Sequence, residues 1–422
     1  MLRKPLFNIG SPKLQFPVID NFINLVPKEI PLSPEIFLSV ESRALLLKDL
    51  PLKVGDRIKT GQKLVFYQNG DGIVSSVTGT IKELYTEAGK ISVTSLIINT
   101  EPDEYDESFP ELLKNAKTDA ETIFYLKSLP GSRSLSNINS KISYCYALVV
   151  DATEKEPYTV TAQYVLASGN NELKDAINLL GTLLKSHKTI MTTFPYLKSM
   201  AVACHSDIKT IAPSYPDSLD ELIFKSIFED KITEDSNVNI YFVGVEAVLA
   251  IARTLSQNKI QTDKFITVID KNRTKFLIKT RIGTPIGWIC KELGISTEIK
   301  DLIAIGGPMR GKSIHCENTP INKDTDSISI QSEKDISWSS SSHCVNCGEC
   351  VRACPAKIPV NMLIRVLENS IYEEAARSFD LFSCIECGMC SYICPAHIPI
   401  LQYITLGKYE YNKASAEDNN HV

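Results

Sequence analysis

The sequence lacks any hydrophobic run long enough to cross a membrane. Its most apolar stretch, Ile240 to Ala252, has 13 residues and contains Glu246, whereas a membrane-spanning helix needs roughly 20 apolar residues. Residues 1–20 contain basic side chains but no uninterrupted apolar segment after them, so we predict no secretory signal. We therefore expect a cytoplasmic chain without a transmembrane segment of its own, which would reach a membrane only through a partner.

An excess of basic residues is also absent. Lysine and arginine number 45 against 50 acidic residues, for a net charge of -5, which argues against nucleic acid as a partner. The content of 43% hydrophobic and 23% charged residues is that of a soluble globular protein. Because 422 residues are too many for one ordinary core, we expect three or four domains.

Common catalytic motifs are missing as well. The six histidines show no H-x-x-x-H pairing, and we interpret His343 and His397, beside cysteines, as surface or supporting residues. The run Gly306–Gly311 follows a predicted strand but does not match G-x-x-x-x-G-K-[ST], so we interpret it as a tight turn. No independent catalytic site is predicted.

Cysteine is present in quantity and is unevenly placed. Eight of the twelve cysteines lie between Cys344 and Cys394. In a long chain without an export signal this clustering favours metal binding over disulfides. The other four are scattered among apolar neighbours, where we expect them to pack as small hydrophobic side chains: Cys145, Cys204, Cys290 and Cys316.

The clustered cysteines form two copies of C-x2-C-x2-C-x3-C-P. In this pattern the first three cysteines surround one iron-sulfur cluster and the fourth ligates the other. We therefore predict two [4Fe-4S] clusters. Cluster 1 is assigned to Cys344, Cys347, Cys350 and Cys394, and cluster 2 to Cys384, Cys387, Cys390 and Cys354.

Zinc is the alternative metal, because zinc sites are also built from C-x2-C pairs. Two tetrahedral zinc ions would need four ligands each, but not the spacing of three close cysteines, a fourth further along and a proline directly after it. The ferredoxin pattern is therefore favoured. Gly348 and Gly388 lie inside the loops, where a missing Cβ lets backbone N-H groups approach the cluster sulfurs. Between the two motifs, Leu363, Leu367 and Ile371 recur every four residues, which predicts one amphipathic helix and a helical dicluster domain.

The remainder reads as a multidomain α/β and α+β chain. Residues 1–104 alternate short strand-like runs with glycine and proline, which predicts a β domain. Residues 105–264 alternate strand and helix patterns typical of a parallel α/β sheet. Residues 265–322 suggest a β-grasp-like unit with one helix starting near Pro285. The acidic stretch 101–111 is predicted to be a solvated linker. Residues 323–342 are predicted to be the last linker, and residues 343–422 the cluster domain.

Several segments together resemble the RnfC family, the C component of Rnf-type electron transport complexes. Among them are the segment from Tyr215 to Ile227, the run Gly283–Gly294, the turn Ile305–Gly311 and the C-terminal cysteine motif. The resemblance implies a barrel-sandwich β domain, a Rossmann-like α/β domain similar to the NADH subunit of respiratory complex I, a β-grasp (SLBB) domain and the dicluster module. The hairpin turn 68–72 lacks the lysine of biotinyl and lipoyl carriers, which indicates a structural barrel-sandwich domain.

One departure from this family concerns flavin. Members that bind FMN carry G-x-G-G-A-G-F-P, whereas the corresponding stretch Tyr125–Ile138 has only Gly131, and Leu126, Leu129 or Arg133 would occupy the space of the flavin. The following E-x-E-P-Y motif persists as Glu154, Glu156, Pro157 and Tyr158, either as a remnant nucleotide site or as a strand end capped by a turn. We therefore do not expect FMN or NADH to bind. The sequence also resembles the NqrA family of the Nqr-type sodium pump, which lacks the glycine loop.

These observations predict an electron-transfer subunit, peripheral on the cytoplasmic face of an Rnf/Nqr-type ion-translocating oxidoreductase. Its partners would be the membrane-embedded subunits and ferredoxin or another redox protein. Two alternatives remain open: a complete NADH- and FMN-dependent oxidoreductase subunit, and a soluble adaptor like those of heterodisulfide reductases.

Overall fold

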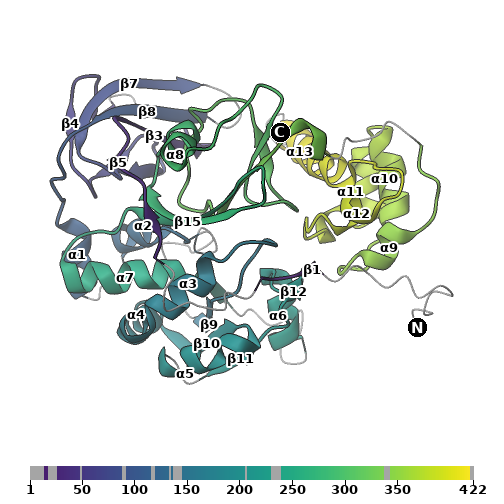
Figure 1. The fold of residues 1–422 in the computed structure, drawn as a ribbon, viewed down its shortest axis with the longest axis horizontal. Helices are drawn as coiled ribbons and strands as arrows, with labels where there is room; N and C mark the ends of the chain where they lie inside the picture. Colours follow the sequence, from purple (N-terminus) through teal and green to yellow (C-terminus); the bar gives the residue numbers. More distant parts are fainter. Residues whose placement is uncertain are drawn as a thin grey trace.

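The protein is described here by a computed structural model. The structure describes residues 14–17, 26–47, 50–87, 92–115, 119–132, 135, 145–204, 207–229, 239–336 and 343–418. Figure 1 shows four packed units in chain order. We call them the first β unit (35–100), the α/β unit (108–257), the second β unit (263–331) and the helical unit (343–418).

The first β unit is an antiparallel sheet with an added hairpin. Its sheet order is β3-β8-β7-β4, with β3 (Glu35–Ser42), β4 (Arg57–Ile58), β7 (Gly79–Glu87) and β8 (Ser92–Thr100), and the hairpin joins β5 (Lys63–Val65) to β6 (Gly72–Val74). Alternate residues of β8 are buried, so that Leu96 and Ile98 join the core of this unit. The turn between β5 and β6 is the lysine-free segment 68–72.

The α/β unit contains a four-stranded parallel sheet in the order β11-β10-β9-β13, as the alternating pattern predicted. Its strands are β9 (Cys145–Asp151), β10 (Ser186–Thr193), β11 (Ile208–Thr210) and β13 (Ile240–Gly244). Strand β9 is buried on both faces, as parallel strands between helices usually are. Within its described residues the unit contains the helices α1 (Ser108–Lys114), α2 (Ala120–Ser128), α3 (Thr161–Ser168), α4 (Asn170–Leu183), α5 (Lys198–Cys204), α6 (Asp220–Phe228) and α7 (Val245–Gln257).

The two faces of this sheet carry separate cores. Leu148 and Val150 of β9 face the large core shared with α2, α4 and α7, whereas Ala147 and Val149 face the smaller core covered by α6. At the edge of the unit, β12 (Ser214–Tyr215) pairs with the N-terminal β1 (Leu14–Gln15).

The second β unit is a mixed six-stranded sheet covered by a helix. Its order is β17-β16-β18-β14-β15-β2, with β2 (Lys28–Glu29), β14 (Asp263–Ile269), β15 (Lys275–Arg281), β16 (Leu302–Ile305), β17 (Lys312–Ile314) and β18 (Ser327–Gln331). The helix α8 (Ile286–Leu293) begins directly after Pro285, as predicted.

Strand β18 differs from the sequence prediction, which placed residues 323–342 in a linker. It lies between β16 and β14, and four of its five residues are buried. Its polar residues Ser327 and Ser329 are buried with the rest. The alternation of serine and isoleucine therefore marks a strand covered on both faces, although its composition looks solvent-exposed.

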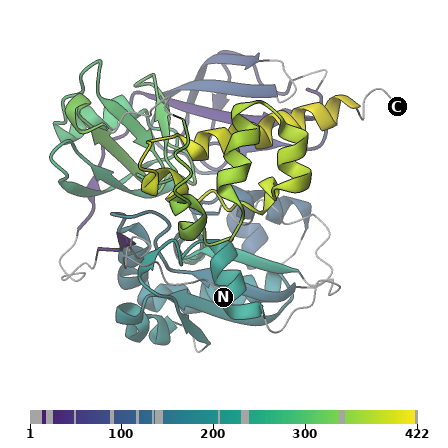
Figure 2. The same ribbon diagram turned by 90° about the vertical axis from the view of Figure 1, so that its right-hand side faces the viewer.

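The helical unit contains only helices among the described residues. They are α9 (Glu349–Ala353), α10 (Val360–Glu368), α11 (Tyr372–Ser378), α12 (Met389–Ile393) and α13 (Ile400–Asp418), and Figure 2 faces this unit. The single helix predicted through Leu363, Leu367 and Ile371 is wrong in its last turn. Ser370 has a φ of +57°, which ends α10, and Ile371 is 45% exposed.

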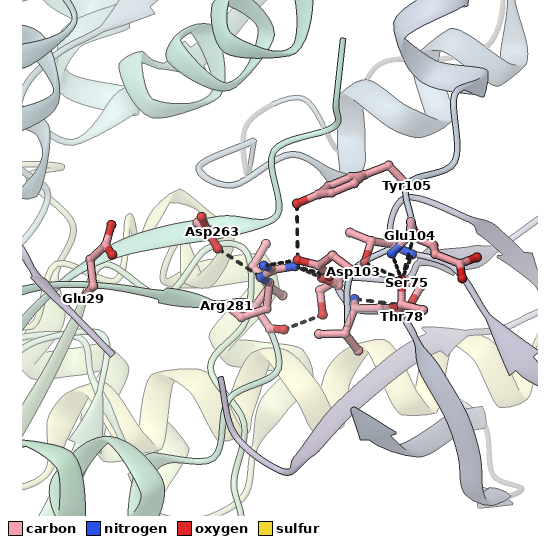
Figure 3. Close-up of polar contacts among 12 residues, drawn as sticks. Glu29, Ser75, Thr78, Asp103, Glu104, Tyr105, Asp263 and Arg281 are labelled. Carbon is pink, nitrogen blue, oxygen red and sulfur yellow. Dashed lines mark hydrogen bonds and ion pairs between the residues drawn. The ribbon is translucent and has the colours of Figure 1, made fainter. Parts of the chain in front are cut away.

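A guanidinium group joins the two β units (Figure 3). Arg281 of β15 donates to both carboxylate oxygens of Asp103 at 3.2 and 2.9 Å and pairs with Asp263 at 3.0 Å. Asp103 lies in the acidic stretch predicted to be a solvated linker. That prediction was wrong for part of the stretch, because Asp103 is bound to the second β unit and Phe109 is buried in α1.

This contact predicts that Arg281→Met separates the β units more readily than a surface charge change does. The Arg281 side chain is 15% exposed, and we expect a loss of about 2–3 kcal/mol, the usual range for hydrogen bonds to charged groups. Chemical unfolding followed by circular dichroism measures it. The matched control is Arg57→Met, because the Arg57 side chain is 46% exposed and surface ion pairs contribute little to stability. Equal losses for the two variants would contradict the role of Arg281.

Candidate metal centres

The two cysteine motifs fold into nearly identical loops. Each loop leads into a five-residue helix, α9 or α12, through a glycine in the left-handed region, with φ of +75° at Gly348 and +73° at Gly388. Ahead of the glycines, the backbone N-H groups of Asn346 and Glu386 donate to the sulfurs of Cys344 and Cys384, each at 3.4 Å. The sequence repeat is thus a repeat of backbone conformation that aims N-H groups at sulfur.

The cysteines face two separate cavities, and each cavity takes residues from both loops. The first cavity is lined by Cys344, Cys347, Cys350 and Cys394. The second cavity is lined by Cys354, Cys384, Cys387 and Cys390. These are the two sets assigned from the sequence. The fourth cysteine of each motif crosses to the opposite cavity because α9 packs against α12.

The two cavities differ in their distance from solvent. Cys387 and Cys390 of the second cavity are 7% and 8% exposed, whereas Cys347 of the first is exposed. The second cavity lies against the rest of the protein: the hydroxyl of Tyr215 donates to the carbonyl of Cys387 at 2.5 Å. A Cβ at position 388 would lie 2.4 Å from the carbonyl of Met309, so glycine is required at this contact.

The chemistry of both cavities suits soft metal ions. Besides the sulfurs, their walls are mainly apolar, with Ile358 and Ile404 in the second and Ile364 and Ile398 in the first. Burial raises the pKa of the Cys387 thiol to about 11, so a thiolate there requires a nearby cation. Four thiols in an apolar shell are the donor set of iron-sulfur sites.

A partly buried cation accompanies the second cavity. Lys408 of α13 donates to the carbonyl of Cys384 at 2.7 Å and to the carboxylate of Glu386 at 2.7 Å. In the first loop a cation contacts a different position, because Arg352 of α9 donates to the carbonyl of Cys347 at 3.0 Å, and Cys347 corresponds to Cys387. Neither basic residue was singled out from the sequence, since neither lies within a recognisable ligand pattern.

A third cavity, which we call the acidic pocket, lies at the carboxyl ends of β9 and β13. The strands that follow β9 in the chain lie on both of its sides, β10 on one and β13 on the other. Ligands of α/β sheets usually bind at the carboxyl ends of the strands where the order reverses in this way. The pocket has a volume of about 200 Å³. Seven carboxylates and two cations line it: Asp151, Glu154, Asp220, Glu221, Glu246, Asp324 and Asp326, with Lys155 and Arg310.

The structure separates the two glutamates of the E-x-E-P-Y motif. Glu154 lines the acidic pocket and accepts the backbone N-H of Gln163 at 3.0 Å. Glu156 instead accepts the N-H of Met309 at 3.0 Å and the guanidinium of Arg310 at 2.9 Å. Glu156 therefore binds the turn at Gly306–Gly311, which the sequence analysis interpreted as a tight turn.

A buried lysine that the sequence analysis missed pairs with two carboxylates of the acidic pocket. Lys264 is 0% exposed and pairs with Glu246 and, at 2.9 Å, with Asp326. Burial lowers the pKa of Lys264, but its two carboxylate partners outweigh burial and the net shift is upward. A charged residue inside the apolar strand β14 was the available signal for this group.

The glycine loop region also differs from the prediction. Leu126 and Leu129, expected in the flavin space, belong to the core of the α/β unit, and Arg133 lies outside the described residues. Gly131 does line the acidic pocket. Its carbonyl lies so close to Gly244, the residue before α7, that a Cβ there would be 2.7 Å away.

Within the described residues, every helix is too short or too polar to cross a bilayer. Of the isolated cysteines, Cys145, Cys204 and Cys290 are buried as expected, whereas Cys316 is exposed.

Comparison with known families supports a cluster domain. The sequence model of a family described as a 4Fe-4S dicluster domain matches residues 337–395. Curated relatives named as the C component of the ion-translocating oxidoreductase complex confirm the resemblance drawn from the sequence. The relative from Buchnera aphidicola subsp. Acyrthosiphon pisum (strain APS) is 24% identical over 83% of this chain and 79% of its own length.

Other relatives with this name are longer than the present chain. The protein from Vibrio cholerae serotype O1 (strain ATCC 39541 / Classical Ogawa 395 / O395) is 24% identical over 74% of this chain, and that from Yersinia pestis bv. Antiqua (strain Antiqua) is 24% identical over 85%. The matches span 44% and 60% of those two relatives. Among solved structures, NAD+-reducing [NiFe]-hydrogenase in the H2-reduced state matches with a TM-score of 0.41 at 12% identity, over 71% of this chain and 59% of that chain.

The burial of Glu154 predicts a pH-dependent stability. Burial raises its pKa to about 7 from an ordinary value of 4.5, so the folded protein binds more protons than the unfolded chain between these values. The stabilisation is present below pH 4.5 and is lost as the pH rises through 7, by about 1.4 kcal/mol between pH 6 and pH 8. Glu154→Gln should remove this loss.

Chemical unfolding at pH 6 and pH 8 under anaerobic conditions measures the difference between variant and wild type. Glu111→Gln, on the exposed side of α1, is the control and should retain the pH dependence of the wild type. The prediction fails if Glu154→Gln and the wild type lose equal stability over this interval.

Proposed function

We propose that this chain is an electron-transfer subunit that holds two [4Fe-4S] clusters in a membrane-associated, Rnf-type ion-translocating oxidoreductase. The observation that carries the proposal is the convergence of four thiols on each of two cavities, with one thiol of each set supplied by the other loop. When bound, a [4Fe-4S] cluster takes up and releases one electron at a time.

The residues proposed as ligands are the two predicted sets. Cluster 1 would be held by Cys344, Cys347, Cys350 and Cys394, and cluster 2 by Cys384, Cys387, Cys390 and Cys354. The donated N-H groups of Asn346 and Glu386 would stabilise negative charge on sulfur, and the apolar walls would exclude water.

The positions of the cavities suggest a direction for partner binding. Cluster 2 would lie beside Tyr215 and Met309, next to the α/β unit, whereas the exposed Cys347 would bring cluster 1 near solvent. An external electron carrier, ferredoxin or another redox protein, would therefore approach cluster 1. The membrane-embedded subunits would hold the chain at the cytoplasmic face of the membrane.

Finer domain names follow the same proposal. We infer a barrel-sandwich domain in residues 1–104, a Rossmann-like domain in 105–264 and an SLBB-type β-grasp domain from residue 265. Because β18 ends at Gln331, the β-grasp domain would extend to that residue, and the linker to the helical domain at 343–422 would be shorter than predicted.

Flavin fits the acidic pocket poorly. Phosphate groups bind helix N-termini through free N-H groups and positive charge. Here the carbonyl of Gly131 lies beside Gly244, the residue before α7, and the acidic Glu246 occupies the first turn of this helix. Seven carboxylates around two cations would repel phosphate further. We therefore propose that Glu154 and Glu156 are structural remnants, and that FMN and NADH do not bind.

The ligand assignment predicts the outcome of cysteine replacements. Anaerobically purified protein should contain about eight irons per chain, four for each cluster. Because Cys354 would belong to the second cavity, Cys354→Ser should lose the same cluster as Cys384→Ser. After reduction with dithionite the two variants should therefore show the same remaining EPR signal, and each should contain roughly half of the iron of the wild type. Cys394→Ser should likewise match Cys344→Ser.

The control for these variants is Cys316→Ser, since Cys316 is an exposed cysteine outside both motifs, and it should retain wild-type iron. If Cys354→Ser instead matches Cys344→Ser, the crossed assignment is wrong. If the purified chain contains zinc, the electron-transfer function is wrong.

The flavin inference has a separate test. Purified protein should contain no stoichiometric FMN, and its visible absorbance should bleach with dithionite but not with NADH alone. A full complement of FMN together with bleaching by NADH would replace the proposal by a complete NADH-dependent oxidoreductase subunit. Co-purification with a soluble partner, and not with a membrane protein, would favour the soluble adaptor.

A further inference from the structure

A fourth cavity, which we call the basic cleft, lies on the second β unit beside the loop that follows Glu156. Its volume is about 280 Å³, near the lower end of the roughly 300–1,000 Å³ typical of small-molecule sites. Strand β18 supplies Ser329 and Gln331, the start of β15 supplies Lys275, and the turn before it supplies Arg273. Tyr158 closes one side.

Two cations of the basic cleft lack a carboxylate partner. Among the described residues, neither Arg273 nor Lys275 forms an ion pair, whereas their neighbour Lys271 pairs with Asp301 and Glu298. Burial lowers the pKa of Lys275, in keeping with the lack of an ion pair between Lys275 and any described carboxylate. The cleft therefore contains two cations that form no ion pair with a described carboxylate.

The acidic residues of the cleft are bound elsewhere. Asp270 accepts the backbone N-H groups of Asn272 and Thr274 at 2.8 and 2.7 Å, which stabilises the turn between β14 and β15. Asp335 accepts the hydroxyl of Ser332 at 2.8 Å. Neither carboxylate pairs with the two cations of the cleft, so an anion can enter without breaking an ion pair between described residues.

A buried hydroxyl group faces the same cleft. Ser329 is 4% exposed, and its Oγ has no hydrogen-bond partner among the described residues. A buried polar group without a partner costs about 1–3 kcal/mol, so an unsatisfied donor at the wall of a cavity points to a ligand. Opposite it, the ring of Tyr158 is half exposed, with the Nζ of Lys275 at 5.1 Å from the ring centroid.

We propose that the basic cleft binds a small molecule that carries a phosphate monoester. Arg273 and Lys275 bind the phosphate, Ser329 donates a hydrogen bond to it, and the ring of Tyr158 lies against the organic part of the ligand. Two cations match the charge of a phosphate dianion, and the planar guanidinium presents paired donors to its oxygens. This site is separate from the cysteine cavities and does not depend on the proposed electron transfer.

Isothermal titration calorimetry on the anaerobically purified full chain tests the proposal with three probes: AMP, inorganic phosphate and adenosine. AMP should bind, phosphate should bind more weakly, and adenosine should not bind. Arg273→Met and Lys275→Met should each lower the affinity for AMP about tenfold or more, since a hydrogen bond to a charged group is lost. Ser329→Ala should weaken it about threefold.

Two variants serve as controls. Lys82→Met removes an exposed lysine of the first β unit that pairs with Glu35, and it should leave AMP binding unchanged. Lys275→Arg keeps the positive charge and should retain binding even if Lys275→Met lowers stability, which circular dichroism reports. The proposal is overturned if neither AMP nor phosphate binds, if adenosine binds as tightly as AMP, or if binding survives both methionine substitutions.

Discussion

The packing of α9 against α12 is the constraint on which the helical unit depends. Each short helix begins at a left-handed glycine, and together they carry Cys354 and Cys394 across to the opposite cavities. Neither loop alone supplies four thiols to one cavity. Completion of either candidate metal centre therefore requires both loops in place, because each cavity takes thiols from both.

The same unit is joined to the rest of the protein beside its second centre. Tyr215 and Met309 contact the loop of Cys387 and Gly388, and Met309 precedes Arg310, whose guanidinium binds Glu156. The E-x-E-P-Y motif thus contributes to the docking of the second β unit, and through it to the surface that receives the helical unit. A motif of nucleotide sites here has an architectural role.

Charge is distributed unevenly over the cavities of this chain. The acidic pocket at the end of the parallel sheet is lined by an excess of carboxylates, and the buried Lys264 pairs with two of them from outside the lining. The basic cleft on the second β unit differs, because two of its cations form no ion pair with a described carboxylate. We propose that the pocket at the usual ligand position of an α/β sheet does not bind phosphate, whereas the basic cleft on the adjacent sheet does.

The amino-acid sequence by itself determined the local features: the cysteine spacing, the parallel α/β alternation, and the start of α8 at Pro285. Each depends on residue type and short-range periodicity, which the backbone expresses directly. Tertiary structure decided what depends on neighbours distant in sequence. It buried the serines of β18 inside a sheet, made Asp103 a partner of Arg281, placed Leu126 and Leu129 in the core, and left Ser329 facing a cleft. Burial and pairing are properties of packed surfaces, and no spacing within a single segment encodes which surface will cover it.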